Sequence, residues 1–301
     1  MAGVVLLSGG TGGAKLARGL LALSDLTVIA NTGDDVEIHG AHVSPDPDLI
    51  TFWLADRIDA RGWGLAGDTF AVMEGLRELG DDVWFNLGDR DLALCLRRSR
   101  RLAEGARLTD VLDEHRRAFG IDARVLPMAD EPVRTRVRAR GVWHGLQEFL
   151  IRERGEGPVE EVAYANAGAA APPPEALEAL ASADAIVVGP SNPAISILPI
   201  LAVPGMREAL QDTAAPVVGV SPLVRGEVVK GPTAAFLAWA GVPASSDGIA
   251  ELYDGVLDGL VADEPADGLP TLVRDVAMPD QAARESLAAD VLRFAAGLGR
   301  A

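Results

Sequence analysis

The sequence contains little cysteine, little lysine and few aromatic residues. A single cysteine, Cys95, excludes an intrachain disulfide and any metal site built from several cysteines. Only two of the 27 basic residues are lysines, Lys15 and Lys230. Aromatic residues make up 5% of the 301 positions and hydrophobic residues 49%, so alanine, valine and leucine must fill the core. This hydrophobic content excludes a chain that is disordered throughout.

Basic residues are outnumbered by 44 acidic residues, which gives a formal net charge of −17. Such a surface repels phosphate backbones and anionic membrane surfaces, so we expect neither nucleic acid nor a membrane among the partners. No apolar run approaches the roughly 18 residues of a membrane-spanning helix. The first residues also lack the basic segment of a signal peptide. We therefore expect a cytoplasmic protein.

Short apolar runs alternate with helical patterns along the chain. Residues 4–7 and 26–30 are unbroken apolar runs, which are typical of strands buried on both faces. Between them lie a glycine-rich loop and a helical pattern over residues 14–23. Strand, loop, helix and strand in this order predict a βαβ unit with parallel strands. The later strands are expected at residues 185–188, 216–220 and 256–261, and the later helices at 175–181, 232–240 and 281–298.

The middle of the chain is richer in helical patterns. Helices are expected over residues 68–79, 89–102 and 108–119, the first two beginning with aspartate, a good N-cap. Residues 133–140 alternate strictly and predict a strand with a solvated arginine face. We predict an α/β fold, a single domain over residues 1–301 with a doubly wound, Rossmann-like parallel sheet. Its core comprises about residues 1–50 and 155–301, with a largely helical insertion over about residues 50–150.

A glycine-rich loop, residues 8–13, follows the first predicted strand and begins the first helix. Small residues at such a position let backbone N–H groups and the positive end of the helix dipole face an anion. A dinucleotide motif counted from Gly10 would need a third glycine where Lys15 stands, and a Walker A loop would need Ser or Thr in place of Leu16. The loop therefore predicts a phosphate site without identifying the nucleotide. A tight turn required only for packing is the alternative.

Acidic residues gather where predicted strands end. They are Asp34 and Asp35, Asp46 and Asp48, and Asp89 and Asp91 on either side of Arg90. Ligands of open α/β sheets bind at the carboxyl ends of the strands, where these loops should meet. Carboxylates beside a phosphate loop favour a hard divalent cation, most simply Mg²⁺. For any one of these aspartates, helix capping is the alternative.

Two further features concern the later loop and the cysteine. In Gly189-Pro190-Ser191-Asn192-Pro193 the prolines fix the turn and leave Ser191 and Asn192 to point into the cleft, as a second loop for an anion or a base. Cys95 has helical spacing with Leu92 and Leu96, which predicts a core residue instead of a nucleophile.

Several motifs occur together in a characteristic order. They are Ser8-Gly9-Gly10-Thr11-Gly12-Gly13, Asn31-Thr32-Gly33-Asp34-Asp35, Ser44-Pro45-Asp46-Pro47-Asp48, Leu87-Gly88-Asp89-Arg90-Asp91, Leu126-Pro127-Met128, Gly189-Pro190-Ser191-Asn192-Pro193 and Val220-Ser221-Pro222. The series resembles the 2-phospho-L-lactate transferase family, which includes a phosphoenolpyruvate-transferring branch and acts in the biosynthesis of the deazaflavin coenzyme F-420.

The resemblance implies a Mg²⁺-dependent phospho-group transferase. The group moved would be 2-phospho-L-lactate or phosphoenolpyruvate, taken from a guanosine-diphosphate-linked three-carbon acid. The terminal ribityl hydroxyl of the deazaflavin Fo would attack the phosphorus, and GMP would leave. Phosphoryl chemistry is mostly positioning and charge stabilisation, so no covalent nucleophile is required. We also expect a homodimer.

Two other functions compete with this one. A nucleotide-sugar-binding regulator of the related gluconeogenesis-factor group has a similar glycine loop, but the Leu-Gly-Asp-Arg-Asp and Pro-Ser-Asn-Pro segments favour the transferase. A generic NAD-dependent enzyme is disfavoured because the dinucleotide motif fails.

The resemblance also assigns roles to individual residues. It places deazaflavin binding at Asp48 and Asn86, although archaeal members can have lysine at the position of Asn86, and Leu49 replaces a threonine of the family. We expect catalytic roles for Asp34, Asp48, Asp89 and Arg90, binding of the guanine nucleotide and its phosphates by Gly10, Thr11, Gly12, Gly13, Lys15, Ser191 and Asn192, and metal binding by Asp34 and Asp46.

Overall fold

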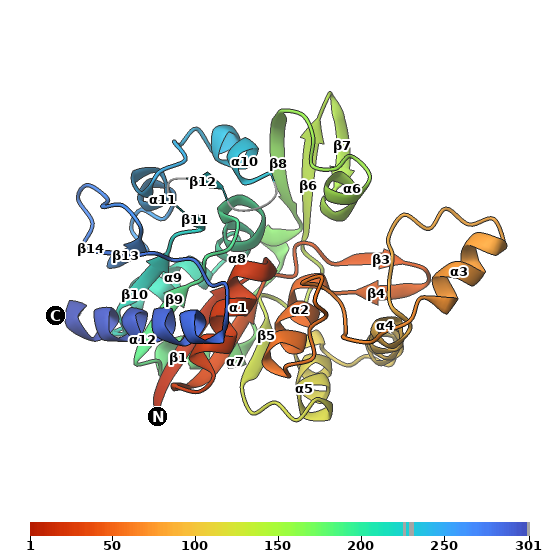
Figure 1. The fold of residues 1–301 in the computed structure, drawn as a ribbon, viewed down its shortest axis with the longest axis horizontal. Coiled ribbons are helices and arrows are strands. Elements are labelled where there is room, and N and C mark those ends of the chain that lie inside the picture. The colour runs from red at the N-terminus through yellow and green to blue at the C-terminus, as the bar shows by residue number, and fades with distance from the viewer. Residues whose placement is uncertain (225–226, 229–231, 300–301) are drawn as a thin grey trace.

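A seven-stranded sheet forms the centre of the protein (Figure 1). The computed structural model describes residues 1–224, 227–228 and 232–299, so Lys230 lies outside the described residues. The strands are β1 (Ala2–Ser8), β2 (Ser24–Ala30), β5 (Arg124–Pro127), β9 (Ala185–Val188), β10 (Val217–Val220), β13 (Gly259–Ala262) and β14 (Thr271–Val273). Their order is β14-β13-β10-β9-β1-β2-β5, and all neighbours are parallel. The two halves run outward from β1 and β9, so the predicted doubly wound α/β fold is confirmed.

Both faces of this sheet are covered by helices, which explains the unbroken apolar strands. Val4 and Leu6 of β1 pack with helices on one face, and Val5 and Leu7 pack with those on the other. The first face holds α1 (Gly10–Leu20), α2 (Pro45–Leu54) and α12 (Gln281–Leu298). The second holds α7 (Pro174–Ala181), α8 (Leu198–Leu201), α9 (Met206–Asp212) and α11 (Ser246–Leu252).

Two smaller units stand beside the carboxyl edge of the sheet (Figure 1). A hairpin of β3 (Val36–Ile38) and β4 (Ala41–Val43) packs on α3 (Ala71–Glu78) and α4 (Asp89–Ala103). An antiparallel sheet of β7 (Val142–Gly145), β6 (Arg134–Ala139) and β8 (Val159–Ala165) packs on α6 (Leu146–Ile151) and α10 (Thr233–Ala240). Residues 50–150 contain α3, α4 and α5 (Leu108–Ala118), and also β5, which pairs with β2 in the central sheet.

Reciprocal capping fixes the start of two of these helices. Asp68 accepts hydrogen bonds from the backbone N–H groups of Arg90 and Asp91, at the start of α4. Asp89 accepts hydrogen bonds from Ala71 and Val72, at the start of α3. Asp68 therefore caps α4, and α3 begins three residues after the predicted start at residue 68, at Ala71. Among the described helices none alone has the length and apolar composition to cross a membrane, and Pro193–Leu201 with Met206–Asp212 qualifies only as a pair bent by 80°.

Cys95 is a core residue, as its spacing predicts. Its side chain is buried on α4 beside Met73, Phe85 and Leu92, and burial raises the pKa of its thiol above the ordinary value. A thiol that is neither ionised nor accessible does not react with disulfide reagents. We expect Ellman's reagent to label the native protein at least about 100-fold more slowly than the urea-unfolded protein. Equal labelling rates for the two states would show that Cys95 is exposed.

Candidate active site

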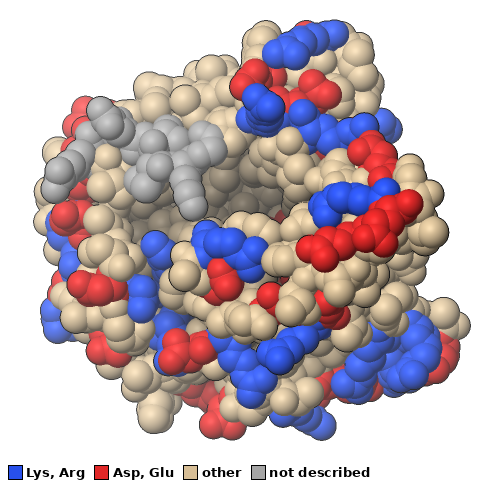
Figure 2. Space-filling view, turned by 45° about the vertical axis from the view of Figure 1, so that its right-hand side comes forward, with Lys and Arg blue, Asp and Glu red and all other residues tan. Residues whose placement is uncertain are grey.

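A cavity of about 1190 Å³ opens at the carboxyl ends of β1 and β9, where the strand order reverses. It is bounded by the glycine-rich segment, whose residues from Gly10 onward form the first turn of α1, by the loop after β9, by the start of α2 and by the helix α6. In the space-filling view it is a hollow whose visible wall is mostly uncharged (Figure 2). Open α/β sheets bind their ligands at this point.

The glycine-rich loop lies in direct contact with the loop after β9. A Cβ atom on Gly12 would lie 2.1 Å from the carbonyl oxygen of Pro190, and one on Gly13 would lie 2.1 Å from Ser8 Oγ. The Gly9 N–H donates to Ser191 Oγ at 3.1 Å. Gly10 instead has a φ of +63°, which favours glycine. Packing thus accounts for Gly12 and Gly13, while backbone conformation accounts for Gly10.

This close contact predicts the effect of Gly12→Ala. Since the obstacle is a backbone carbonyl, the two loops must move apart, and we expect a loss of about 1–3 kcal/mol in the free energy of unfolding. Urea denaturation measures it. Gly75→Ala on α3 is the matched control, because nothing lies within 4 Å of the added Cβ and alanine favours the helix. Equal stability of the two variants would contradict the packing role.

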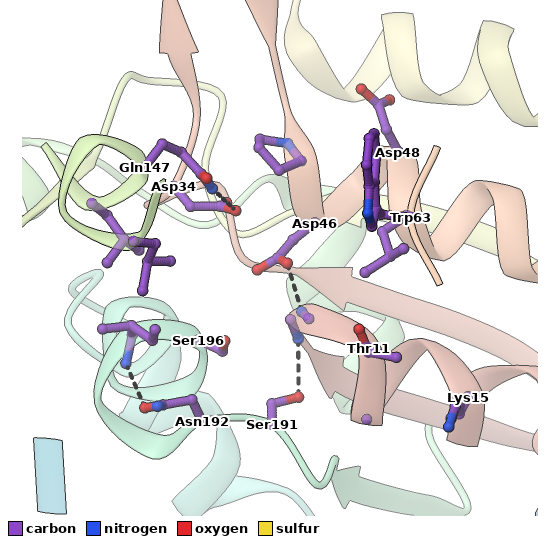
Figure 3. Close-up of a pocket in the computed structure, with 18 of the residues that line it drawn as sticks. Thr11, Lys15, Asp34, Asp46, Asp48, Trp63, Gln147, Ser191, Asn192 and Ser196 are labelled. Carbon is purple, nitrogen blue, oxygen red and sulfur yellow. Dashed lines mark hydrogen bonds between the residues drawn. The ribbon is translucent and has the colours of Figure 1, made fainter. Parts of the chain in front are cut away.

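Two buried carboxylates, Asp34 and Asp46, lie next to this loop (Figure 3). Asn31 Nδ2 donates to both, at 3.3 Å to Asp34 Oδ1 and 2.9 Å to Asp46 Oδ2. Asp46 Oδ1 also accepts the Gly10 N–H at 2.5 Å, and Gln147 Nε2 donates to Asp34 Oδ2 at 3.1 Å. These contacts hold two negative charges close together at the start of α1.

Burial makes both carboxylates harder to ionise. It raises the pKa of Asp34 well above its usual range, and the charge of Asp46 raises it further. It raises the pKa of Asp46 to about 6, against the opposing hydrogen bonds from Asn31 and Gly10. The neighbouring Asp35 has a buried oxygen, Oδ1, with no hydrogen-bond partner among the described residues. Two neighbouring buried carboxylates with raised pKa values, Asp34 and Asp46, suit a hard divalent cation.

A second group of buried side chains surrounds Asp48. Its Oδ1 accepts a hydrogen bond from Arg98 Nη2. A carboxylate oxygen of Asp48, a carboxylate oxygen of Asp91 and Cys95 Sγ lie within 4.8 Å of one another. Burial raises the pKa of Asp91 to about 7, and the charge of Asp48 adds to this effect. Arg98 supplies the positive charge here. Arg98 was not predicted from the sequence, although it shares helical spacing with Asp91 and Cys95 on the buried face of α4.

The structure brings most of the predicted site residues to this cavity. Gly10, Thr11, Gly12, Lys15, Asp34, Asp46, Asp48, Asn86, Ser191 and Asn192 all line it. Gly13 is packed behind them against Ser8 and Ser191. Asn192 uses its Oδ1 to accept from the N–H groups of Ala194 and Ile195, so it also holds the turn after β9.

Asp89 and Arg90 are the exceptions. Neither belongs to the described residues that line the cavity. Asp89 caps α3, so helix capping, the alternative role given for these aspartates, applies to it. Arg90 is exposed and lines a separate groove of about 580 Å³. Asp89 and Arg90 stand next to Asp91 in the sequence, but of the three only Asp91 lines the cavity.

An apolar wall of the cavity was not predicted. Trp63, Trp84 and Leu49 line it, whereas the ring of Phe52 is buried against Phe119. Trp63 is 43% exposed, and the Arg61 guanidinium lies 4.4 Å from the centre of its ring. Figure 3 shows Trp63 beside Asp48. The wall combines residues from three separate segments, so no local pattern reveals it.

Comparisons with known proteins show the family to which the chain belongs. Residues 4–283 match the model of the family described as 2-phospho-L-lactate transferase CofD. The chain is 41% identical over 266 residues to the 2-phospho-L-lactate transferase of Methanosarcina mazei, which covers 87% of each chain. It is 38% identical over 309 residues to the phosphoenolpyruvate transferase of Streptomyces coelicolor, covering 94% of this chain and 97% of the relative.

A solved structure supports the fold. The crystal structure of a UPF0052-family protein from Bacillus halodurans superposes with a TM-score of 0.66 at 17% identity, over 97% of this chain and 99% of that one.

Proposed function

The chain belongs to the 2-phospho-L-lactate transferase family of coenzyme F-420 biosynthesis, and we propose that it transfers a phospho-three-carbon acid to the deazaflavin Fo. The group is 2-phospho-L-lactate or phosphoenolpyruvate, carried by a guanosine-diphosphate-linked donor. The ribityl hydroxyl forms the new P–O bond, the P–O bond to GMP breaks, and the hydroxyl proton leaves to a carboxylate of the site. A nucleotide-sugar-binding regulator is not favoured, because the curated relatives of the chain are named as transferases.

One observation carries the proposal. A single cavity joins a glycine-rich helix N-terminus to an apolar, aromatic wall, with buried carboxylates between them. Phosphate oxygens suit the first, since free N–H groups and the helix dipole favour anions. A flat deazaflavin ring suits the second, because aromatic side chains bind ring systems by stacking. The transferred phosphorus would then lie beside the carboxylates.

On the donor side, the start of α1 and the loop after β9 would hold the guanine nucleotide. Gly10, Thr11, Gly12 and Gly13 form the first turn of α1 and would face the phosphates, although the Gly10 N–H is already held by Asp46, and Lys15 adds a positive charge further along α1. Ser191 and Asn192 approach from the opposite loop (Figure 3). Asp46 already accepts the Gly10 N–H, so a phosphate here needs a cation to offset the carboxylate charge.

Asp34 and Asp46 would bind that cation, Mg²⁺. Their carboxyl groups are buried beside the phosphate loop, and burial raises their pKa values, which supports a bound cation that offsets their charge. Bound Mg²⁺ would neutralise phosphate charge as it moves to the leaving GMP. Gln147 and Asn31 orient the two carboxylates through their amide groups.

On the acceptor side, Asp48 and Asn86 would bind the deazaflavin against the aromatic wall. Asp48 lines the cavity, and its carboxylate is a hydrogen-bond acceptor for an N–H or O–H of the ligand. Asn86 lines the cavity and accepts from Arg77 Nη2 at 2.9 Å. A cytoplasmic location and a homodimeric state stay predictions from the sequence.

The test is a panel of donors. Purified protein is mixed with Fo, Mg²⁺ and guanosine-diphosphate-linked lactate or enolpyruvate in turn, and GMP is quantified by chromatography. We expect release with one donor to exceed release with the other, and to stop when EDTA removes the metal. No release with any donor would refute the transferase function.

A further inference from the structure

A fully buried arginine lies behind the acceptor side of the cavity. The side chain of Arg98 on α4 is 0% exposed, whereas that of its neighbour Arg97 is 40% exposed. Arg98 Nη2 donates to Asp48 Oδ1 at the start of α2, and its Nη1 donates to the backbone carbonyl of His42 on β4 at 3.0 Å. The guanidinium thereby holds two elements at fixed positions relative to α4.

These contacts constrain only one oxygen of the Asp48 carboxylate. Oδ1 is held by Arg98, while Oδ2 is buried and has no hydrogen-bond partner in the described part of the chain. Asp48 also lines the cavity. A carboxylate with one oxygen anchored presents the other in a fixed direction, and a planar guanidinium does this better than an ammonium because its donors are rigidly arranged.

A purely structural role does not account for this pair. Replacing a buried ion pair with apolar residues is often neutral or stabilising, so such a pair is weak evidence for stability. The neighbours of Arg98 on the buried face of α4 include Leu92 and Cys95, which form part of an apolar cluster. The Arg98 charge in this cluster is explained by its hydrogen bond to Asp48, which it holds in the cavity wall.

We infer that Arg98 is a positioning residue for the acceptor substrate, because its guanidinium fixes Asp48 and the start of α2 in the cavity wall that faces the deazaflavin. The inference rests on the proposed function, in which Asp48 contacts the deazaflavin. Arg98 itself does not reach the substrate and acts through Asp48. The donor side of the cavity should not depend on it.

Arg98→Lys tests the inference. Lysine keeps the positive charge beside Asp48 but cannot bond Asp48 and the His42 carbonyl in the same geometry. We expect the KM for Fo to rise about 10-fold or more, while the KM for the guanosine-linked donor stays within about twofold. Arg97→Lys on the same helix is the control, because Arg97 pairs with Glu114 at the surface, and it should behave as wild type. An unchanged KM for Fo, or equal increases for both substrates, would overturn the inference.

A double variant covers the case in which Arg98→Lys does not fold. Asp48→Asn combined with Arg98→Gln removes both charges of the ion pair together. If Arg98 acts through Asp48, the double variant has the same KM for Fo as Asp48→Asn alone. A further multiplicative increase would show that Arg98 acts independently and would overturn the inference. Wild-type protein that releases no GMP with any donor would instead refute the proposed function itself.

Discussion

Asp46→Asn is expected to lower kcat/KM for transfer by about 100-fold or more while leaving the protein folded. Asparagine keeps an oxygen that accepts the Gly10 N–H, so the start of α1 stays in place, although the acceptor for Asn31 Nδ2 is lost. What is lost is one of the two negative charges proposed to hold Mg²⁺. The measurement is steady-state GMP release at saturating donor, with and without Mg²⁺.

The thermal stability of the same variant separates metal binding from folding. The pKa of Asp46 is raised to about 6, so ionising it in the metal-free protein costs stability as the pH rises through 6. At pH 7.5 without metal, the Tm of Asp46→Asn should therefore be no lower than that of wild type. Any excess in the Tm of the variant should vanish near pH 4. Mg²⁺ should raise the Tm of wild type and not that of the variant.

The control for this experiment is Asp25→Asn, which removes an equal charge from an exposed position on β2. It should retain the activity and the Mg²⁺ response of wild type. If Asp46→Asn kept full activity or its Mg²⁺ response, the assignment of Asp46 to the metal would be wrong.

Asp48→Ala is expected to weaken deazaflavin binding by about 10- to 100-fold, because it removes a charged hydrogen-bond acceptor from the cavity wall. Binding of GDP should change by less than about threefold, since the phosphate loop is not touched. Fluorescence titration with Fo and calorimetric titration with GDP measure the two affinities. Equal loss of both would contradict the division of the cavity into donor and acceptor sides.

The buried arginine beneath Asp48 requires a companion variant. Alanine leaves the Arg98 charge without its partner, which destabilises by about 3–5 kcal/mol in comparable buried pairs. Asp48→Asn keeps an oxygen for Arg98 and so retains more of the stability. The two variants should lose deazaflavin affinity alike but differ in Tm.

The central fold could be predicted because its sequence signals are local. Residues 4–7 and 26–30 are apolar on both faces since helices cover both sides of the sheet, and the glycine-rich loop follows at the switch point. α2 was not predicted because Pro45 and Pro47 resemble a loop. Proline in the first turn, followed by aspartate, is in fact typical of a helix start.

The site could be predicted only in part, for a different reason. Sequence motifs identified Asp34, Asp46 and Asp48, but not which way each side chain in a motif points. Asp89 caps a helix although it stands two residues from Asp91, which lines the cavity. Arg98 and Trp63 could not be predicted, because each meets the site only through folding. Arg98 bonds to Asp48, 50 residues away, and Trp63 reaches the cavity from another loop.

The mass of the deazaflavin product tests the central claim most directly. Fo, Mg²⁺ and the preferred donor are incubated with the protein, and the deazaflavin is analysed by liquid chromatography and mass spectrometry alongside the released GMP. We expect a new deazaflavin heavier by one phospho-three-carbon-acid group, formed in a one-to-one ratio with GMP. Release of GMP with unmodified Fo would show that the cavity hydrolyses the donor and does not join the two substrates.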